Sequence, residues 1–189
     1  MSIVLVGSTS GSITLQEPAV AGTTVLTLPA TSGTLITTGT TGQVIASGAL
    51  PIGSVLQVVN ATYSTETSVS SSSLVDTGLT ATITPKFSTS KILILVEHNG
   101  CGKQSSNTYI ALYLNRSATQ LASFGGLAGY NNGNANNGIG GISISYLDSP
   151  ATTSSTTYKT QFSSVSNTGF ATFQWGDAVS TITLMEIAG

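Results

Sequence analysis

Residues 91–96 read Lys-Ile-Leu-Ile-Leu-Val and hold five consecutive aliphatic side chains. In an extended strand the two isoleucines and the valine point to one face, and the two leucines point to the other. A strand that is apolar on both faces is typical of a central strand, or of one covered by a second layer. The run is too short for a helix and is soon followed by Asn99-Gly100. We therefore expect it to be the central strand on which the rest of the chain packs.

Further segments with strand periodicity follow one another through residues 54–189. In residues 141–147, for example, isoleucine and tyrosine alternate with serine. The expected strands are 54–63, 74–85, 91–98, 108–116, 141–147, 156–163, 170–175 and 181–187, with 64–73 as a possible edge strand. No stretch shows a sustained helical period with caps. This pattern predicts an all-β fold, with an antiparallel, jelly-roll-like β-sandwich over residues 54–189.

Residues 1–40 hold only short strand-like segments between turns. These segments are 3–6, 12–16, 24–28 and 34–37. Forty residues with so few large side chains cannot bury enough apolar surface on their own. We expect this block to be a trimerisation or docking segment, joined to the sandwich by a Gly-containing linker over residues 41–53.

Charged side chains are scarce, at 6% of residues against about 25% in an ordinary globular protein. Disorder is a poor explanation, because 40% of residues are hydrophobic and disordered chains combine low hydrophobicity with high charge. Interfaces between subunits are depleted in charged residues. The composition therefore favours a β-rich protein that packs against copies of itself.

Several classes of function are excluded by charge and hydropathy. The net charge is −2, and the five basic residues are scattered, so no basic patch is available for nucleic acid. No run of 18 apolar residues predicts a membrane-spanning helix, and the first residues lack the pattern of a signal peptide. The single cysteine excludes an internal disulfide.

Catalytic and metal-binding patterns are weak. His98 and Cys101 are close in sequence, but a strand-end histidine and a small buried thiol explain them better than a catalytic dyad. The seven acidic residues are dispersed, and no ligand spacing typical of a metal site occurs within one chain. We expect no catalytic residues, no resident metal and no cofactor; a trimer that repeats His98 around an axis is the one metal site left open.

Residues 125–141 contain seven glycines and five asparagines, which predicts a long loop. Long loops often carry binding residues, and aromatic rings with amide groups suit a sugar by stacking and hydrogen bonding. Trp175 stands beside another turn, Gly176-Asp177. Core or interface packing is the better explanation for most aromatic residues of the chain, and Trp175 and Tyr130 are the least core-like by context. The candidate receptor-binding residues are Tyr130, Asn131, Asn132, Asn134, Asn136, Asn137 and Trp175.

Two parts of the sequence have patterns that recur in other proteins. Residues 11–35 read Gly-Ser-Ile-Thr-Leu-Gln-Glu-Pro-Ala-Val-Ala-Gly-Thr-Thr-Val-Leu-Thr-Leu-Pro-Ala-Thr-Ser-Gly-Thr-Leu. They resemble a segment that recurs in tail-fibre-like and other virion surface proteins of tailed phages, especially phages of aquatic bacteria. Four pieces of the later sequence resemble the C-terminal module of the same proteins. They are Pro51-Ile-Gly-Ser-Val-Leu-Gln-Val-Val, Ile83-Thr-Pro-Lys with Ser90-Lys-Ile-Leu-Ile, Tyr146-Leu-Asp-Ser-Pro and Thr181-Ile-Thr-Leu-Met-Glu-Ile.

The resemblance implies a homotrimeric virion protein. Its N-terminal segment would attach to other virion proteins, and its C-terminal β domain would face the host. We expect a short tail fibre that binds a cell-surface glycan, without membrane insertion. Phage fibres usually have a longer shaft, so a capsid head fibre or decoration protein with a mechanical role is the alternative. A depolymerase that cleaves host polysaccharide is a third hypothesis.

Overall fold

The structure is a computed structural model, and it describes residues 3–6, 12–15, 50–104, 108–131, 137–165 and 169–189. The chain divides into two compact units, Met1–Val44 and Ile45–Gly189. In the first unit, β1 (Ile3–Val6) and β2 (Ser12–Leu15) form an antiparallel pair. Both strands were expected from the sequence, whereas the expected strands at 24–28 and 34–37 lie outside the described residues.

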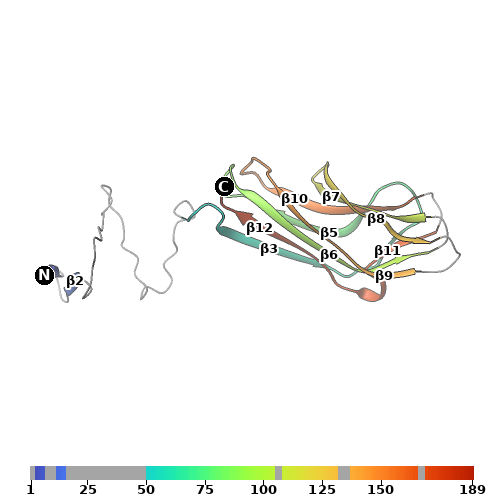
Figure 1. The fold of residues 1–189 in the computed structure, drawn as a ribbon, viewed down its shortest axis with the longest axis horizontal. Helices are drawn as coiled ribbons and strands as arrows, with labels where there is room; N and C mark the ends of the chain where they lie inside the picture. The colour runs from blue at the N-terminus through green and yellow to red at the C-terminus, as the bar shows by residue number, and fades with distance from the viewer. Residues whose placement is uncertain (1–2, 7–11, 16–49, 105–107, 132–136, 166–168) are drawn as a thin grey trace. The chain divides into compact units, whose positions relative to one another are not determined.

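The second unit is an antiparallel β-sandwich, as the sequence predicts (Figure 1). One sheet has the order β5-β10-β7-β8, and the other has the order β3-β12-β6-β11-β4, with β9 also paired to β6. The strands are β3 (Val55–Tyr63), β4 (Thr67–Val69), β5 (Val75–Ile83), β6 (Lys91–Lys103), β7 (Thr108–Arg116), β8 (Thr119–Asn131), β9 (Asn137–Asp148), β10 (Thr156–Ser164), β11 (Ala171–Phe173) and β12 (Ser180–Ile187). We refer to the two sheets as the four-stranded and the six-stranded sheet.

β6 is central in the six-stranded sheet, which confirms the expectation drawn from residues 91–96. Its first half pairs with β12 on one edge, and β9 runs along the other edge. Ile92 and Ile94 are completely buried, whereas Leu95 on the opposite face is 38% exposed. Burial on both faces, which the sequence also suggested, is therefore wrong for a single chain. The reason is that the four-stranded sheet covers only one face of β6.

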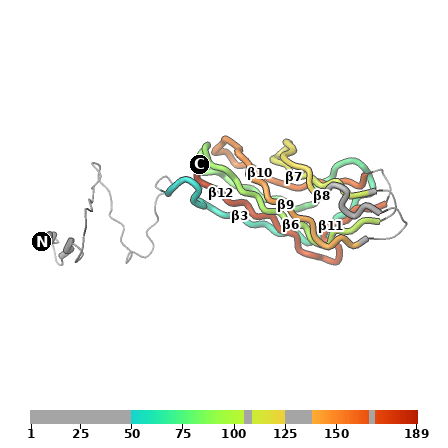
Figure 2. Tube along the Cα trace, viewed as in Figure 1, coloured from blue at the N-terminus to red at the C-terminus, as the bar shows by residue number. Residues whose placement is uncertain are grey.

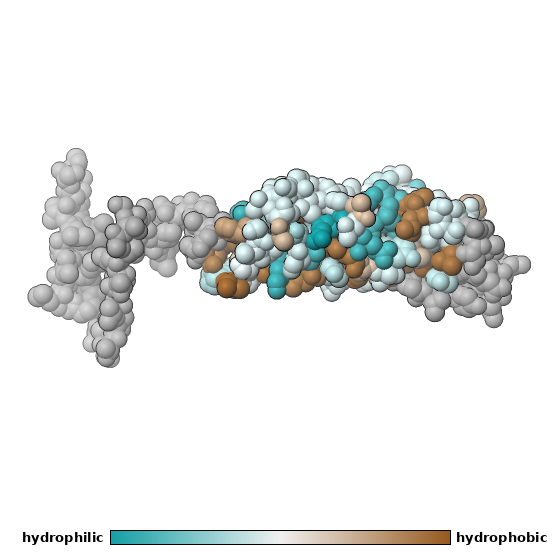
Figure 3. All heavy atoms as spheres, turned by 90° about the horizontal axis from the view of Figure 1, so that it is seen from above, coloured by the Kyte–Doolittle hydropathy of each residue, from teal (hydrophilic) through white to brown (hydrophobic). Residues whose placement is uncertain are grey.

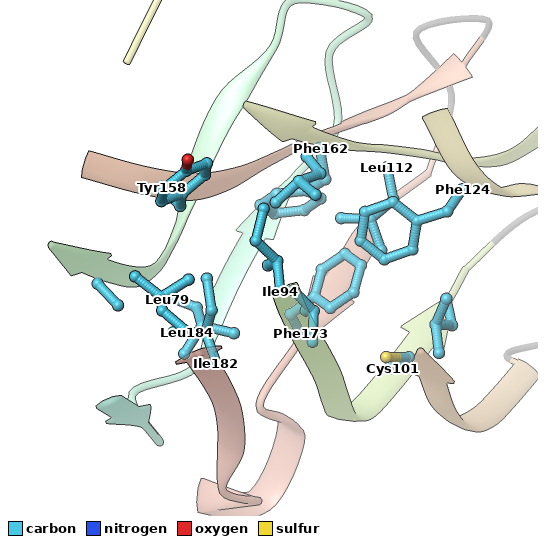
Figure 4. Close-up of a cluster of buried hydrophobic side chains, with 14 of the residues drawn as sticks. Leu79, Ile94, Cys101, Leu112, Phe124, Tyr158, Phe162, Phe173, Ile182 and Leu184 are labelled. Atoms are coloured by element: carbon cyan, nitrogen blue, oxygen red, sulfur yellow. The ribbon is translucent and has the colours of Figure 1, made fainter. Parts of the chain in front are cut away.

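The core lies between the two sheets and consists of alternating residues from their inner faces. Phe162 of β10 meets Phe173 of β11 edge to face, with ring centroids 4.7 Å apart. Figure 4 shows these side chains reaching toward one another from opposite sheets, with Leu112, Ile182 and other aliphatic residues around them. Burying each such side chain stabilises the fold by roughly 1.5–3 kcal/mol before losses in conformational entropy. This core holds the two sheets in a fixed relation and so gives surface residues a rigid support.

The long loop expected at residues 125–141 is wrong. Most of it is strand: β8 continues to Asn131, and β9 begins at Asn137. Thr108 of β7 pairs with Asn131, and Ile110 pairs with Ala128, although the register shifts between these pairs. Glycine and asparagine have low intrinsic strand propensity, but a neighbouring strand that satisfies their backbone groups overrides that preference. The shifts in register absorb the irregularity as β-bulges.

The two ends of the sandwich differ. At one end the chain enters β3 beside its own C-terminus, where the Gly53 N–H donates to the Ala188 carbonyl and the Ala188 N–H donates to the Ser54 carbonyl. β11 and the adjoining turn lie toward the other end of the sandwich (Figure 2). Much of the coloured surface drawn in Figure 3 is pale and of intermediate hydropathy, with hydrophilic residues and brown apolar patches between. Such a surface fits a chain with 6% charged residues.

Candidate binding site

The turn that follows β11 presents Trp175 to solvent. A short 3₁₀ turn, η3 (Trp175–Asp177), separates β11 from β12, and the Trp175 side chain is 52% exposed. Gln174, Gly176 and Asp177 all have positive φ angles, of 58°, 65° and 59°. Three left-handed residues in four let the chain loop out of the sheet and return to it, so that β11 and β12 run in the same direction along the same edge of β6.

Hydrogen bonds from β6 anchor this turn. The Gln174 N–H donates to the Asn99 carbonyl at 3.0 Å, and the Asn99 side-chain amide donates to the Val179 carbonyl at 2.8 Å. Gly100, with φ 61°, lies against the turn, because a Cβ built there would be 2.5 Å from the Trp175 nitrogen. The position of Trp175 therefore depends on a glycine in the C-terminal part of β6.

Beneath the turn lies a buried polar chain centred on His98. The Gln174 amide donates to Ser180 Oγ at 2.8 Å and contacts His98 Nδ1 at 3.3 Å, and His98 Nε2 is 2.9 Å from Thr160 Oγ1. The ring also packs edge-on against Phe173, with centroids 4.8 Å apart. Burial lowers the pKa of His98 to about 4, so the ring is neutral at pH 7. With Nδ1 accepting from Gln174, the proton resides on Nε2 and is donated to Thr160.

Cys101 and His98 do not form a thiol–imidazole pair in this arrangement. The Cys101 thiol donates to the backbone carbonyl of His98 at 3.6 Å, while both ring nitrogens of His98 face other side chains. Burial raises the pKa of Cys101 to about 12, which keeps the thiol protonated at neutral pH. The geometry is that of a buried structural pair, which is the interpretation favoured from the sequence.

A pocket of about 370 Å³ opens beside Trp175 on the six-stranded sheet. Its floor crosses three paired strands, where Ser68 of β4 lies opposite Thr172 of β11, and Thr172 lies opposite Gly102 of β6. The two hydroxyls are hydrogen-bonded to each other at 2.8 Å. Gly102 contributes no side chain, so the floor is lower at that strand. The hydroxyls of Ser68 and Thr172 can also exchange hydrogen bonds with a polar ligand, because a hydroxyl both donates and accepts.

Aromatic and polar side chains form the remaining walls of the pocket. Phe170, which is 48% exposed, is the second aromatic residue in contact with it. Glu66 is an exposed acid, and Gln104 carries an exposed amide. Lys103 is only 3% exposed; its ammonium donates to the Gln104 carbonyl at 2.6 Å, and burial lowers its pKa. The pocket thus combines two apolar rings with donors and acceptors of several kinds.

Among the residues whose side chains the structure describes, the candidate named from the sequence that lines this pocket is Trp175. The backbones of Tyr130 and Asn131 lie in β8 and that of Asn137 in β9, but the structure does not describe their side chains. Asn132, Asn134 and Asn136 lie outside the described residues. The pocket residues that sequence reasoning missed are Glu66, Ser68, Gly102, Lys103, Gln104, Phe170 and Thr172.

Other polar groups in the described ranges serve the fold. The Arg116 guanidinium contacts both carboxylate oxygens of Asp148 at 2.9 and 2.8 Å, and the Tyr158 hydroxyl donates to the same carboxylate at 2.7 Å. No group of three His, Cys, Asp or Glu side chains within the described segments could hold a metal ion. The same segments contain no helix long and apolar enough to cross a membrane.

No protein-family model matches the chain, and a search of curated proteins finds no similar sequence.

Proposed function

We propose that this chain is a structural virion protein of a phage, a short homotrimeric tail fibre that attaches the particle to glycan on the host surface. The observation that carries the proposal is the exposed Trp175 ring beside Phe170, above a floor of hydroxyl groups and glycine backbone. Sugar rings present C–H groups that pack on an aromatic face and hydroxyls that exchange hydrogen bonds with polar side chains.

The size and place of the pocket support this function. Small-molecule sites usually have volumes of roughly 300–1,000 Å³, so a pocket of about 370 Å³ suits one or two sugar rings. Weak single sites are sufficient for adsorption when three copies act together, because linked sites raise the overall avidity by roughly 10²–10⁴. In this proposal residues 1–40 hold the trimer or dock to other virion proteins, and the sandwich reaches the host. No catalytic step, metal or cofactor is assigned to it.

A pair of variants in the same turn tests the proposal. Trp175→Ala removes the exposed ring, and we expect it to weaken binding to host glycan at least about tenfold, as losing a central aromatic contact usually does. Val179→Ala is the control, because Val179 is similarly exposed, at 51%, but does not line the pocket. Binding is measured on immobilised host polysaccharide, and folding by thermal melting. Equal binding by both variants would place the receptor site elsewhere.

The position of the protein on the particle separates the tail fibre from the capsid alternative. Antibody label at the tail in electron micrographs supports host attachment. Label spread over the head would instead support a head fibre or decoration protein, and absence of binding to any host polysaccharide would agree with that result. Release of soluble sugar from the polysaccharide would contradict a purely binding role and favour a depolymerase.

A further inference from the structure

The outer face of the six-stranded sheet carries a row of large apolar side chains. One residue comes from each of four adjacent strands, and consecutive members are paired in register: Val58, Met185, Leu93 and Leu147. Val58 and Leu147 are 55% and 52% exposed, and the other two are half-buried. We call these four residues the apolar row.

The outer face of the four-stranded sheet is different. Thr82 and Thr157 share a hydrogen bond of 2.8 Å across β5 and β10, and Lys159 and Gln161 both donate to Asp76. Among the described residues, no exposed large hydrophobic side chain lies on β5, β7, β8 or β10, whereas four lie on β3, β6 and β9. A sandwich whose two outer faces were both solvated would be polar on both. The difference indicates that the six-stranded sheet is covered.

A hollow adjoins the apolar row on the same face. Its volume is about 570 Å³, and its lining includes Leu95, Thr183 and Ser145. These three residues are paired with one another in the row next to the apolar row. Small hydroxyl side chains beside large apolar ones leave a stepped surface that side chains of a second molecule can fill.

We propose that the outer face of β3, β12, β6 and β9 is the surface through which copies of this chain pack against one another. This rests on the homotrimer of the proposed function. Three copies around an axis parallel to the strands bring the same row of each copy to the same height. The apolar rows then meet one another, as do the hydroxyl-bearing rows, so one surface satisfies all three subunits.

Charge and area both fit another copy as the occupant. Lys91 and Glu97 are the only charged residues that point outward on the described parts of these four strands, so most of the face carries no charge. Four strands about 4.8 Å apart and the eight residues of β12 at about 3.4 Å each give a projected area of roughly 500 Å². The accessible area of side chains on a pleated sheet exceeds this projection, so the area that each subunit buries against its two neighbours together approaches the ~800 Å² that one partner buries in a specific interface.

A charge placed in the apolar row tests the inference. Leu147→Glu should lower the mass in solution to one-third of the wild-type value, measured by light scattering, because the carboxylate would be buried between subunits. Val58→Glu, at the other end of the apolar row, should lower the mass in solution in the same way. Thr82→Glu, on the outer face of the four-stranded sheet, should keep the wild-type mass. Both Leu147 and Thr82 are exposed in the single chain, so the variants should remain folded, which circular dichroism checks.

The outcomes separate this inference from the glycan site. If Leu147→Glu and Val58→Glu keep the wild-type mass, or if Thr82→Glu dissociates equally well, another surface joins the subunits and the inference is wrong. A wild-type mass of 19.1 kDa, that of one chain, also overturns it. Glycan binding is measured on the same samples. If the variants dissociate as expected but the wild-type oligomer binds no glycan, the interface proposal is supported and the proposed attachment function is contradicted.

Discussion

Gly100 of β6 and Trp175 of η3 are in backbone contact: a Cβ on Gly100 would lie 2.5 Å from the Trp175 nitrogen and 2.8 Å from its carbonyl oxygen. Neither atom belongs to a flexible side chain, so the turn would have to move to make room. The exposed tryptophan is thus positioned by a residue that is remote in sequence and has no side chain.

The first prediction concerns this contact. Gly100→Ala should destabilise the fold by about 2–3 kcal/mol, from the left-handed φ of 61° together with the clash, and should weaken glycan binding. Gly140→Ala is the matched control, because Gly140 has φ 86° but nothing within 4 Å of its would-be Cβ. It should cost only about 1 kcal/mol and leave binding unchanged. Urea unfolding measures both costs, and equal costs would show that the contact with Trp175 is not tight.

The second prediction concerns pH. Burial lowers the pKa of His98 from 6.5 to about 4, so the unfolded chain binds a proton at this residue before the folded protein does. Stability should therefore fall as the pH drops from about 6.5 to about 4, by roughly 3 kcal/mol in total. Unfolding free energies measured across this range check the slope. If the unfolding free energy did not change between these two pH values, the buried ring would accept a proton without loss of stability.

A third prediction compares two ion pairs. Asp148→Asn should cost about 2 kcal/mol, because it leaves the Arg116 guanidinium without its anionic partner at a carboxyl site that is only 6% exposed. Asp76→Asn should cost less than about 1 kcal/mol, because its pair with Lys159 is exposed to solvent. Both values come from urea unfolding at pH 7. If Asp76→Asn lowered the unfolding free energy more than Asp148→Asn, the Arg116–Asp148 pair would contribute little to joining β7 to β9.

The fourth prediction concerns Cys101, which is 1% exposed and whose thiol has a pKa raised to about 12. A thiol-specific reagent at pH 8 should leave the native protein unlabelled and should label one thiol per chain in urea. Mass spectrometry counts the labels. Rapid labelling of the native protein would show that the sandwich opens near the C-terminal end of β6.

The strands that sequence reasoning placed well are those with clear alternation. β7 was expected at 108–116 and lies at Thr108–Arg116, and β12 was expected at 181–187 and begins one residue earlier, at Ser180. β8 was missed because its second half is rich in glycine, and only pairing with β7 makes that segment a strand. Local pattern therefore failed where contacts between distant segments decide the conformation.

The pocket shows the same limit. Trp175 could be named from its neighbours Gly176 and Asp177, which indicate a turn and hence exposure. Ser68 and Thr172 could not be named, because an isolated serine and threonine carry no signal in a chain rich in both. They become a site only when β4 pairs with β11. Phe170 had one usable signal, a preceding glycine at the start of a strand.

The turn at η3 separates the residue that points outward from the residues that hold it. Gln174, Asn99 and Gly100 form the support, and none of their hydrogen bonds involves the indole ring. The ring can therefore be replaced while its support stays intact. In the tail fibre proposed above, such a division would allow the bound glycan to change by single substitutions at position 175, without a new fold having to evolve each time.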